Sequence, residues 1–377
     1  ILIRSGDYAI VCRSLGQDEK AIISEEYRAA ETQLVENTVN VYETGIFKSG
    51  ESGYDGTGMV VAVLDTGIRI GHEDLNPAKV HCTTGDKEEY FYMEGVEFTP
   101  DDIYDGHGTH VSGIIAAKAG NGKGGAGIAP DVTLLSCNVF LPDSTCAADD
   151  VIEGIEWAMQ NGADIINMSL GSNTYNGAFA AAVKNAYESG VAVFCAAGND
   201  ATSSYHYPAS YSGAICIAAL DVGLQKWGFS NYCDKVRYAF PGVDIYSAIS
   251  GEDSNNDGIL EATTDSYGMM SGTSMASPVG AGVAAVALQY AKENGKMNNL
   301  TGAAKVKKLL SIMDSAAIPI ATKGLGKGCI SLSKLTGAAV YEGIPAKPVI
   351  IENGAGKYTD EFIDVSFVQK KDIIVCY

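Results

Sequence analysis

The chain has 377 residues, 46% of them hydrophobic, and a formal net charge of −20. The acidic balance argues against nucleic acid as a partner. No stretch approaches the roughly 20 unbroken apolar residues of a membrane span. Nine cysteines are scattered without a Cys-x-x-Cys pair, which argues against a zinc or redox motif and against a disulfide scaffold.

Apolar runs and helical stretches alternate along the chain, which is the βαβ pattern of a parallel sheet with helices on both faces. We expect strands at 59–64, 132–139, 164–168, 191–196 and 214–219, and helices at 107–117, 149–161, 175–189, 275–293 and 302–313. The predicted fold class is therefore α/β, three-layer αβα with a mostly parallel central sheet.

The two ends of the chain differ from this pattern. Residues 1–40 precede it and are interpreted as an N-terminal extension or a propeptide remnant, which leaves residues 41–340 as one domain. Residues 341–377 combine a proline-containing linker with two apolar runs. They predict a short C-terminal β segment that begins a truncated β-sandwich-like module.

The first chemical motif follows the strand expected at 59–64. Asp65 ends that strand, and open α/β sheets place their sites just past the carboxyl ends of the strands. His107 comes next, between two glycines that suit a tight backbone at the start of a helix. Taken alone, Asp65 would be read as a turn residue, but His107 and a later serine change that interpretation.

Ser274 lies in Gly-Thr-Ser-Met-Ala-Ser-Pro, at the amino end of an apolar helix where the partial positive charge of the helix favours a nucleophile. A serine hydroxyl needs a base to take its proton, and that base needs a partner that sets its tautomer. Asp65, His107 and Ser274 supply these three roles. The serine motif is not the Gly-x-Ser-x-Gly elbow of α/β-hydrolases, which argues against a lipase.

These motifs, with Ala-Ala-Gly-Asn ending at Asn199, resemble those of the subtilisin-like serine proteases over about residues 54–335. The resemblance implies a subtilisin-like fold and an Asp65–His107–Ser274 triad. It also implies an oxyanion hole formed by the Asn199 amide and the Ser274 N–H. By the family pattern, His110 is structural.

Substrate contacts also follow from the resemblance. A peptide would add as a β-strand along Ser169, Leu170 and Gly171. The first specificity pocket would lie between that segment and residues 196–199, which include Ala197 and Gly198. Asp200 would stand at its rim, and His206 would reach its floor and favour polar side chains. The alternative is that a shortened loop moves His206 away from the pocket.

The chemistry needs no cofactor, but family members often bind structural calcium. Asp74 matches a ligand position, although the glycine-rich loop at 119–125 departs from the known calcium loop in length and carries a lysine. A second candidate is the loop with Asp253, Asn255 and Asp257, which has the oxygen spacing of an EF-hand but lacks the bidentate Glu. A solvated polar loop is the alternative interpretation of both.

The main hypothesis is an active serine endopeptidase that acts through an acyl-enzyme, with protein or peptide as its partner. The alternatives are a catalytically idle binding protein and another acyl-transfer enzyme, such as an esterase or ligase. The resemblance implies a secreted or cell-surface protein of bacterial origin. The oligomeric state is left open.

Overall fold

The computed structural model describes residues 2–5, 8–11, 54–84, 106–119, 121, 123–141, 144–221, 223–249 and 266–336. The predicted C-terminal module and most of the predicted N-terminal extension lie outside these residues. Both therefore remain predictions. Within the extension, β1 (Leu2–Ser5) and β2 (Tyr8–Val11) form an antiparallel pair.

The core of the fold is a seven-stranded parallel sheet in the order β4-β5-β3-β6-β7-β8-β9. Its strands are β3 (Val60–Asp65), β4 (Lys79–Cys82), β5 (Thr133–Asn138), β6 (Ile165–Met168), β7 (Ala192–Ala196), β8 (Ala214–Leu220) and β9 (Val236–Pro241). The inner strands are almost continuously apolar because both of their faces are covered.

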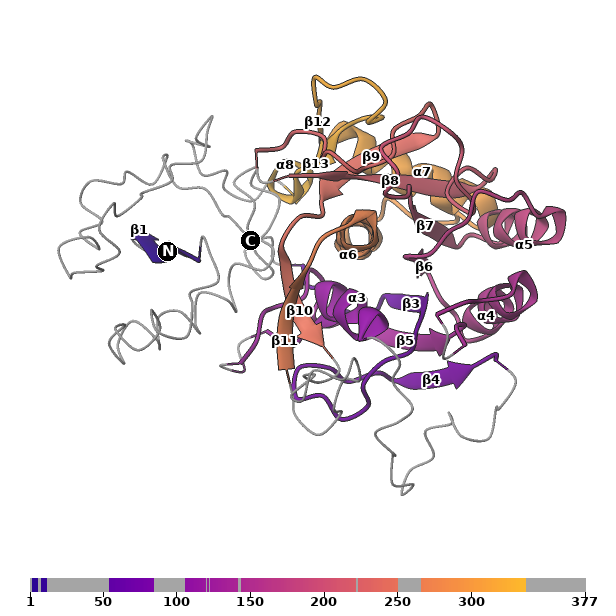
Figure 1. Cartoon of the computed structure of the whole chain (residues 1–377), viewed down its shortest axis with the longest axis horizontal. Helices are drawn as coiled ribbons and strands as arrows, with labels where there is room; N and C mark the ends of the chain where they lie inside the picture. Colours follow the sequence, from indigo (N-terminus) through magenta and orange to yellow (C-terminus); the bar gives the residue numbers. More distant parts are fainter. Residues whose placement is uncertain are drawn as a thin grey trace.

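Helices cover both faces of the sheet, which makes three layers (Figure 1). On one face, α3 (His107–Ala116) packs on β3 and β5, and α6 (Thr273–Glu293) packs on β6 to β9. On the other face lie α4 (Ala148–Gln160) and α5 (Gly177–Glu188). The chain continues into α7 (Gly302–Ser315), which contacts both α5 and α6, and α8 (Leu332–Thr336).

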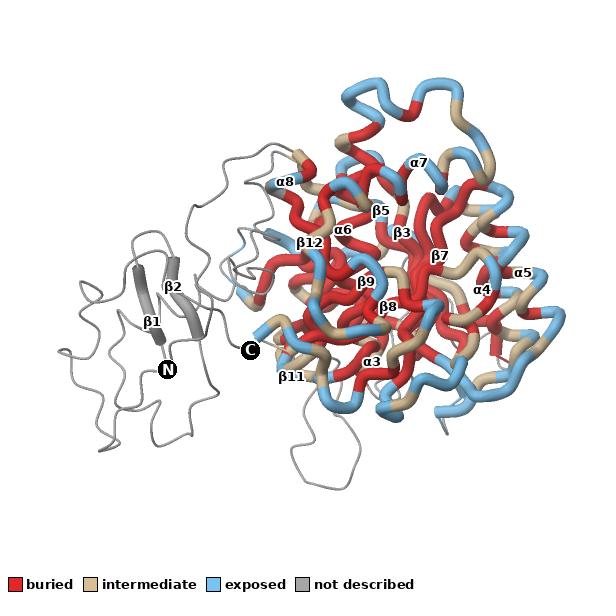
Figure 2. The backbone as a smooth tube through the Cα atoms, turned by 90° about the horizontal axis from the view of Figure 1, so that it is seen from above, coloured by how far each residue is buried: buried red, intermediate tan, exposed pale blue. Residues whose placement is uncertain are grey.

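Helix α6 is buried along nearly its whole length, in contrast to the half-exposed α4 and α5 (Figure 2). Two glycines allow this close packing. A Cβ on Gly280 would lie 3.0 Å from the Phe240 ring, and a Cβ on Gly282 would lie 2.7 Å from Ile128. The sheet and α6 therefore form one rigid body that holds the amino end of α6 in place.

Two smaller sheets complete the described part. An antiparallel hairpin joins β10 (Ile245–Ile249) to β11 (Ser266–Met270), and β12 (Ala317–Ile318) pairs with β13 (Cys329–Ile330). The predicted α/β class is confirmed, and the strands and helices expected between residues 59 and 313 are present with ends within two residues. The sequence patterns missed β4 and β9, which form the two edges of the sheet.

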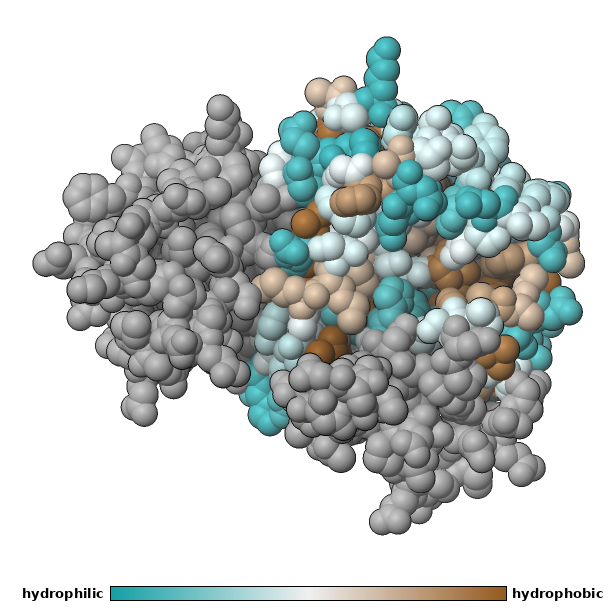
Figure 3. Space-filling model, viewed as in Figure 1, coloured by the Kyte–Doolittle hydropathy of each residue, from teal (hydrophilic) through white to brown (hydrophobic). Residues whose placement is uncertain are grey.

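Where Figure 3 colours the surface, small apolar patches are scattered among hydrophilic residues. In the part of the chain that the structure describes, no helix combines the length and the apolar character that crossing a bilayer requires. The seven described cysteines are free thiols.

Candidate active site

The ends of β3 and α3 bring an acid and an imidazole together. Asp65 is the last residue of β3 and is 1% exposed, and its Oδ1 lies 2.7 Å from Nδ1 of His107. The same oxygen accepts the backbone N–H of Thr66 at 2.8 Å. The other carboxylate oxygen of Asp65, Oδ2, is buried and makes no hydrogen bond in the described structure. A positive charge on His107 would therefore be well compensated by this carboxylate.

A close approach of two backbone segments sets this pairing. The N–H of Gly108 donates to Oγ1 of Thr66 at 2.9 Å, so the start of α3 is tied to the turn after β3. A Cβ on Gly108 would lie only 2.1 Å from the carbonyl oxygen of Gly67. Glycine is required there because any side chain would push His107 away from Asp65.

Ser274 is the second residue of α6 and is half-buried. Its Oγ donates to the carbonyl of Ser169 at 3.2 Å, and its own carbonyl accepts the Ser169 hydroxyl at 2.7 Å. Helix α3, which begins with His107, packs against α6, which carries Ser274 in its first turn.

Asn199 is exposed, but the orientation of its amide is set by hydrogen bonds. Its Oδ1 accepts both the N–H and the hydroxyl of Thr273, each at 2.9 Å. The amide nitrogen therefore faces the other way. A Cβ on Gly272 would lie 3.4 Å from this nitrogen and 3.6 Å from the Ser274 backbone nitrogen. The two donors thus border one small space that stays open because residue 272 is glycine.

Asn231 stabilises the loop at 197–202 that carries Asn199. The sequence analysis did not identify Asn231. Its buried side chain accepts the N–H groups of Asp200 and Thr202, at 2.9 and 3.1 Å, and donates to the Ala197 carbonyl at 3.0 Å. Its backbone N–H also donates to Gly198. One buried amide therefore fixes the geometry of the loop from both sides.

A second buried network, also missed from the sequence, joins β6 to α6. The Ser277 hydroxyl donates to Oδ1 of Asn167 at 2.7 Å, and the Asn167 amide donates to the Ser169 hydroxyl at 3.0 Å. Asn167 and Ser277 are fully buried. The only signal in the sequence was a polar residue inside the apolar strand Ile-Ile-Asn-Met.

The model of the subtilase family matches residues 56–328. The chain belongs to the subtilase family. Subtilisin DY of Bacillus licheniformis is 36% identical over 244 residues, which are 63% of this chain and 78% of that relative. A thermostable alkaline protease of Halalkalibacterium halodurans is 37% identical over 250 residues, 66% of this chain and 60% of that relative. Among solved structures, a protease from Pseudoalteromonas arctica superposes with a TM-score of 0.64 at 26% identity, covering 85% of this chain and 97% of that one.

In this subtilase His110, the second histidine of the Gly-His-Gly-Thr-His motif at 106–110, lies in the core. His110 is 0% exposed, and its Nε2 lies 2.8 Å from the Ile245 carbonyl and 3.2 Å from the Gly268 carbonyl. Burial lowers the pKa of His110 to about 4. The ring is therefore neutral at neutral pH, and it joins α3 to the β10–β11 hairpin.

The expected substrate segments both lie against His206. Ser169 and Leu170 are buried, whereas Gly171 is exposed, and Ser172 forms an antiparallel bridge with Tyr207. A Cβ on Gly171 would lie 2.6 Å from the His206 ring, and a Cβ on Gly198 would lie 3.1 Å from its Nδ1. The His206 ring therefore packs against both segments, and its place at the floor of a specificity pocket stays a prediction.

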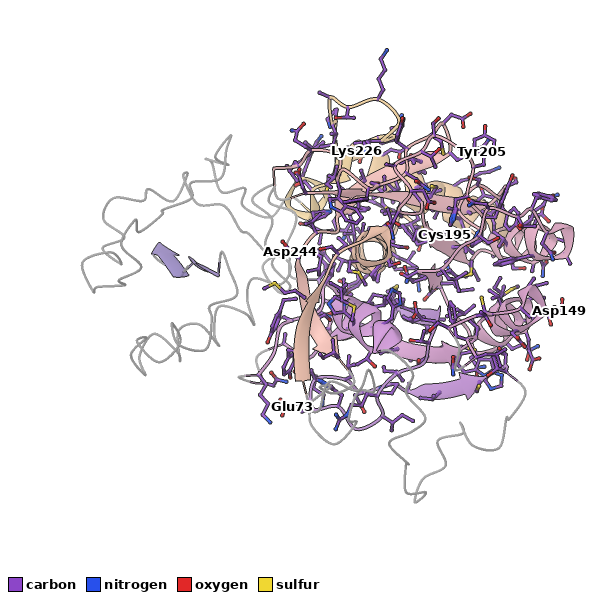
Figure 4. All side chains as sticks on the ribbon, in the orientation of Figure 1. Glu73, Asp149, Cys195, Tyr205, Lys226 and Asp244 are labelled. Atoms are coloured by element: carbon purple, nitrogen blue, oxygen red, sulfur yellow. The ribbon has the colours of Figure 1, made fainter. Side chains whose placement is uncertain are left out.

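The residues at the first calcium candidate do not match a calcium cage. Asp74 is 0% exposed, and its carboxylate lies beside the Tyr267 hydroxyl. Asn121 uses its Oδ1 for the Lys123 N–H and turns its amide nitrogen toward Asp74. The Lys123 ammonium pairs with Glu73, at the edge of the molecule (Figure 4). The second candidate, at Asp253, Asn255 and Asp257, lies outside the described residues.

Proposed function

We propose that this subtilase is a serine endopeptidase in which His107 activates Ser274, Asp65 orients His107, and Asn199 with the Ser274 N–H binds the oxyanion. The observation that carries the proposal is the 2.7 Å contact between the buried Asp65 carboxylate and Nδ1 of His107. A carboxylate beside Nδ1 favours the tautomer with the proton on Nδ1 and Nε2 free to act as the base, which is the tautomer that serine activation requires.

In the proposed reaction the Ser274 hydroxyl turns from the Ser169 carbonyl and gives its proton to Nε2 of His107. Its oxygen attacks the carbonyl carbon of the substrate, and the resulting oxyanion enters the space beside Gly272. His107 then protonates the leaving amine, which yields an acyl-enzyme. Water hydrolyses that intermediate by the same base. Donors fixed before the reaction pay no reorganisation cost when charge develops, and the two Thr273 hydrogen bonds to Asn199 support such fixing.

His206 would set the preference for the side chain that precedes the cleaved bond. Its Nδ1 is buried without a hydrogen-bond partner in the described structure, and its Nε2 faces Asp200 at 4.0 Å. Burial lowers the pKa of His206, although Asp200 opposes this effect. A neutral ring with an unused nitrogen favours substrate side chains that donate a hydrogen bond, such as Ser, Thr, Asn or Gln.

The test is to incubate the purified chain and its Ser274→Ala variant with a fluorophosphonate probe and a mixed peptide library. Labelling and cleavage that disappear in the variant would establish the nucleophile. A folded wild-type chain that neither labels nor cleaves would overturn the proposal and favour an idle binding protein. Labelling with turnover of esters but not of peptides would favour another acyl-transfer enzyme.

The same library tests the pocket. Wild-type cleavage should favour hydrogen-bonding side chains, and His206→Leu should shift the preference toward apolar ones. Asp200→Asn is the matched control, since it keeps the ring in place and changes only the charge at the rim. Unchanged specificity in His206→Leu would exclude His206 from the pocket. Secretion and bacterial origin remain predictions from the family resemblance.

A further inference from the structure

Two cysteines lie together where β8 meets the segment that leads into β9. Cys216 is on β8, opposite Val236 of β9, and Cys233 precedes Val236 by three residues. Cys216 is 1% exposed, whereas Cys233 is half-buried. Their side chains are hydrogen-bonded to each other. One sulfur is therefore accessible and the other stands directly behind it.

The surroundings of Cys233 favour a thiolate. It accepts a hydrogen bond from the Cys216 thiol and others from the backbone N–H groups of Lys235 and Val236, which together bring its pKa to about 6 although burial opposes this. The same pairing, together with burial, raises the pKa of Cys216. Cys146 offers a contrast, since it is also half-buried but burial raises its pKa to about 11.

The segment that carries Cys233 also holds the Asn199 loop. Cys233 follows Asn231 by two residues, and the N–H of the intervening Tyr232 donates to the Thr202 carbonyl at 2.9 Å. Ser230 anchors the other end of the segment, because its hydroxyl accepts the N–H of Ala219 on β8 at 2.9 Å. A displacement of Cys233 toward β8 would therefore pull directly on the residues that position Asn199.

We propose that Cys233 is a peroxide-reactive thiolate and that its oxidation joins it to Cys216 in a reversible disulfide that lowers the activity of the enzyme. The Cys233 thiolate attacks one oxygen of hydrogen peroxide, which breaks the O–O bond, gives a sulfenic acid and releases hydroxide. The sulfur of Cys216 then displaces hydroxide from the sulfenic acid. The two hydroxides take up two protons, so two thiols and one peroxide give one disulfide and two waters.

The buried Cys195 is the competing partner for Cys216. It is the residue opposite Cys216 on β7, and it lies in the interior of the molecule (Figure 4). It is 0% exposed, and burial raises its pKa far above the usual range. A buried, protonated thiol cannot start the reaction, so Cys195→Ala is the matched control for Cys233→Ser.

The first measurement does not depend on activity. The Ser274→Ala protein, which cannot digest itself, is treated with iodoacetamide near neutral pH, and the labelling rate of each cysteine is read by peptide mass spectrometry. Cys233 should react at least about tenfold faster than Cys146, because only the thiolate is nucleophilic. A second sample is treated with hydrogen peroxide and searched for the Cys216–Cys233 peptide pair. Equal labelling of Cys233 and Cys146, or a peroxide-treated sample without this pair, would overturn the proposal.

The effect on activity rests on the proposed function and is measured separately on the chain with Ser274 intact. Peroxide should reduce peptide hydrolysis, by up to about 10²-fold if Asn199 moves by 1 Å, and dithiothreitol should restore it. Cys195→Ala should behave like the wild type, whereas Cys233→Ser should keep its activity in peroxide. A disulfide that forms without loss of activity would overturn the link to Asn199. A reduced chain that hydrolyses nothing would instead overturn the proposed function, while the labelling result would stand.

Discussion

Acid should weaken the fold through His110, and the size of the effect follows from its burial. The unfolded chain binds a proton on this histidine near pH 6.5, whereas the folded chain binds it only near pH 4. Between these values the unfolded state holds more protons, so stability falls as the pH falls. Each pKa unit corresponds to about 1.4 kcal/mol, and the whole window therefore removes about 3 kcal/mol.

The variant His110→Gln removes the titrating ring. It should be less stable than its parent near pH 7, because it loses the Nε2 hydrogen bonds to the Ile245 and Gly268 carbonyls. That difference should shrink by about 3 kcal/mol between about pH 6.5 and pH 4, since the variant has no ring to protonate. The assay is urea unfolding followed by fluorescence, on a Ser274→Ala background that prevents autolysis.

Ser247→Ala is the control. Its hydroxyl donates to the His110 carbonyl at 2.8 Å, so the substitution weakens the same junction between α3 and the hairpin without removing a titrating group. The difference between this variant and its parent should not change with pH. The reasoning would be refuted if His110→Gln and its parent kept a constant difference over the same range.

Three further predictions concern the site and its surroundings. Gly272→Ala should lower kcat by about 10²–10³, the range measured for loss of one oxyanion donor in subtilisin. The added methyl group would fill the space beside Asn199 without a clash, so Tm should change little. Asn231→Ala should lower kcat more than it changes KM and reduce stability by about 1–3 kcal/mol, since one buried and two half-buried backbone groups lose their partner. An unaltered kcat would exclude Asn231 as a positioning residue. Burial raises the pKa of Asp74, so its charge destabilises the fold at neutral pH. Asp74→Asn should therefore gain stability relative to the parent as pH rises through the acidic range. A parent that is instead more stable than the variant at neutral pH, with a Tm that calcium raises in the parent alone, would refute this and favour calcium at Asp74.

The elements predicted from the sequence are those whose signal is local. The inner strands are continuous apolar runs because both faces of a parallel sheet are buried, and β3, β6 and β7 were found on that basis. The edge strands β4 and β9 carry polar or charged residues such as Lys79 and Arg237. Strand β4 has four residues and no apolar run, and β9 is interrupted by Arg237 and ends in a proline, so neither has the long apolar run that marks the inner strands.

The candidate site also combines residues that have a local signal in the sequence with residues that only the fold brings together. The sequence by itself determined the fold class and the family motifs, and it predicted the proposed acid, base, nucleophile and oxyanion donor, because each stands in a short local motif. The tertiary structure decided what supports them. Asn231, the Asn167–Ser277 network and the Cys216–Cys233 pair act across segments that meet only when strands pair or α6 docks on the sheet. A hydrogen bond between residues far apart in the chain leaves no periodic trace in the sequence, so these contacts could be found only in the folded chain.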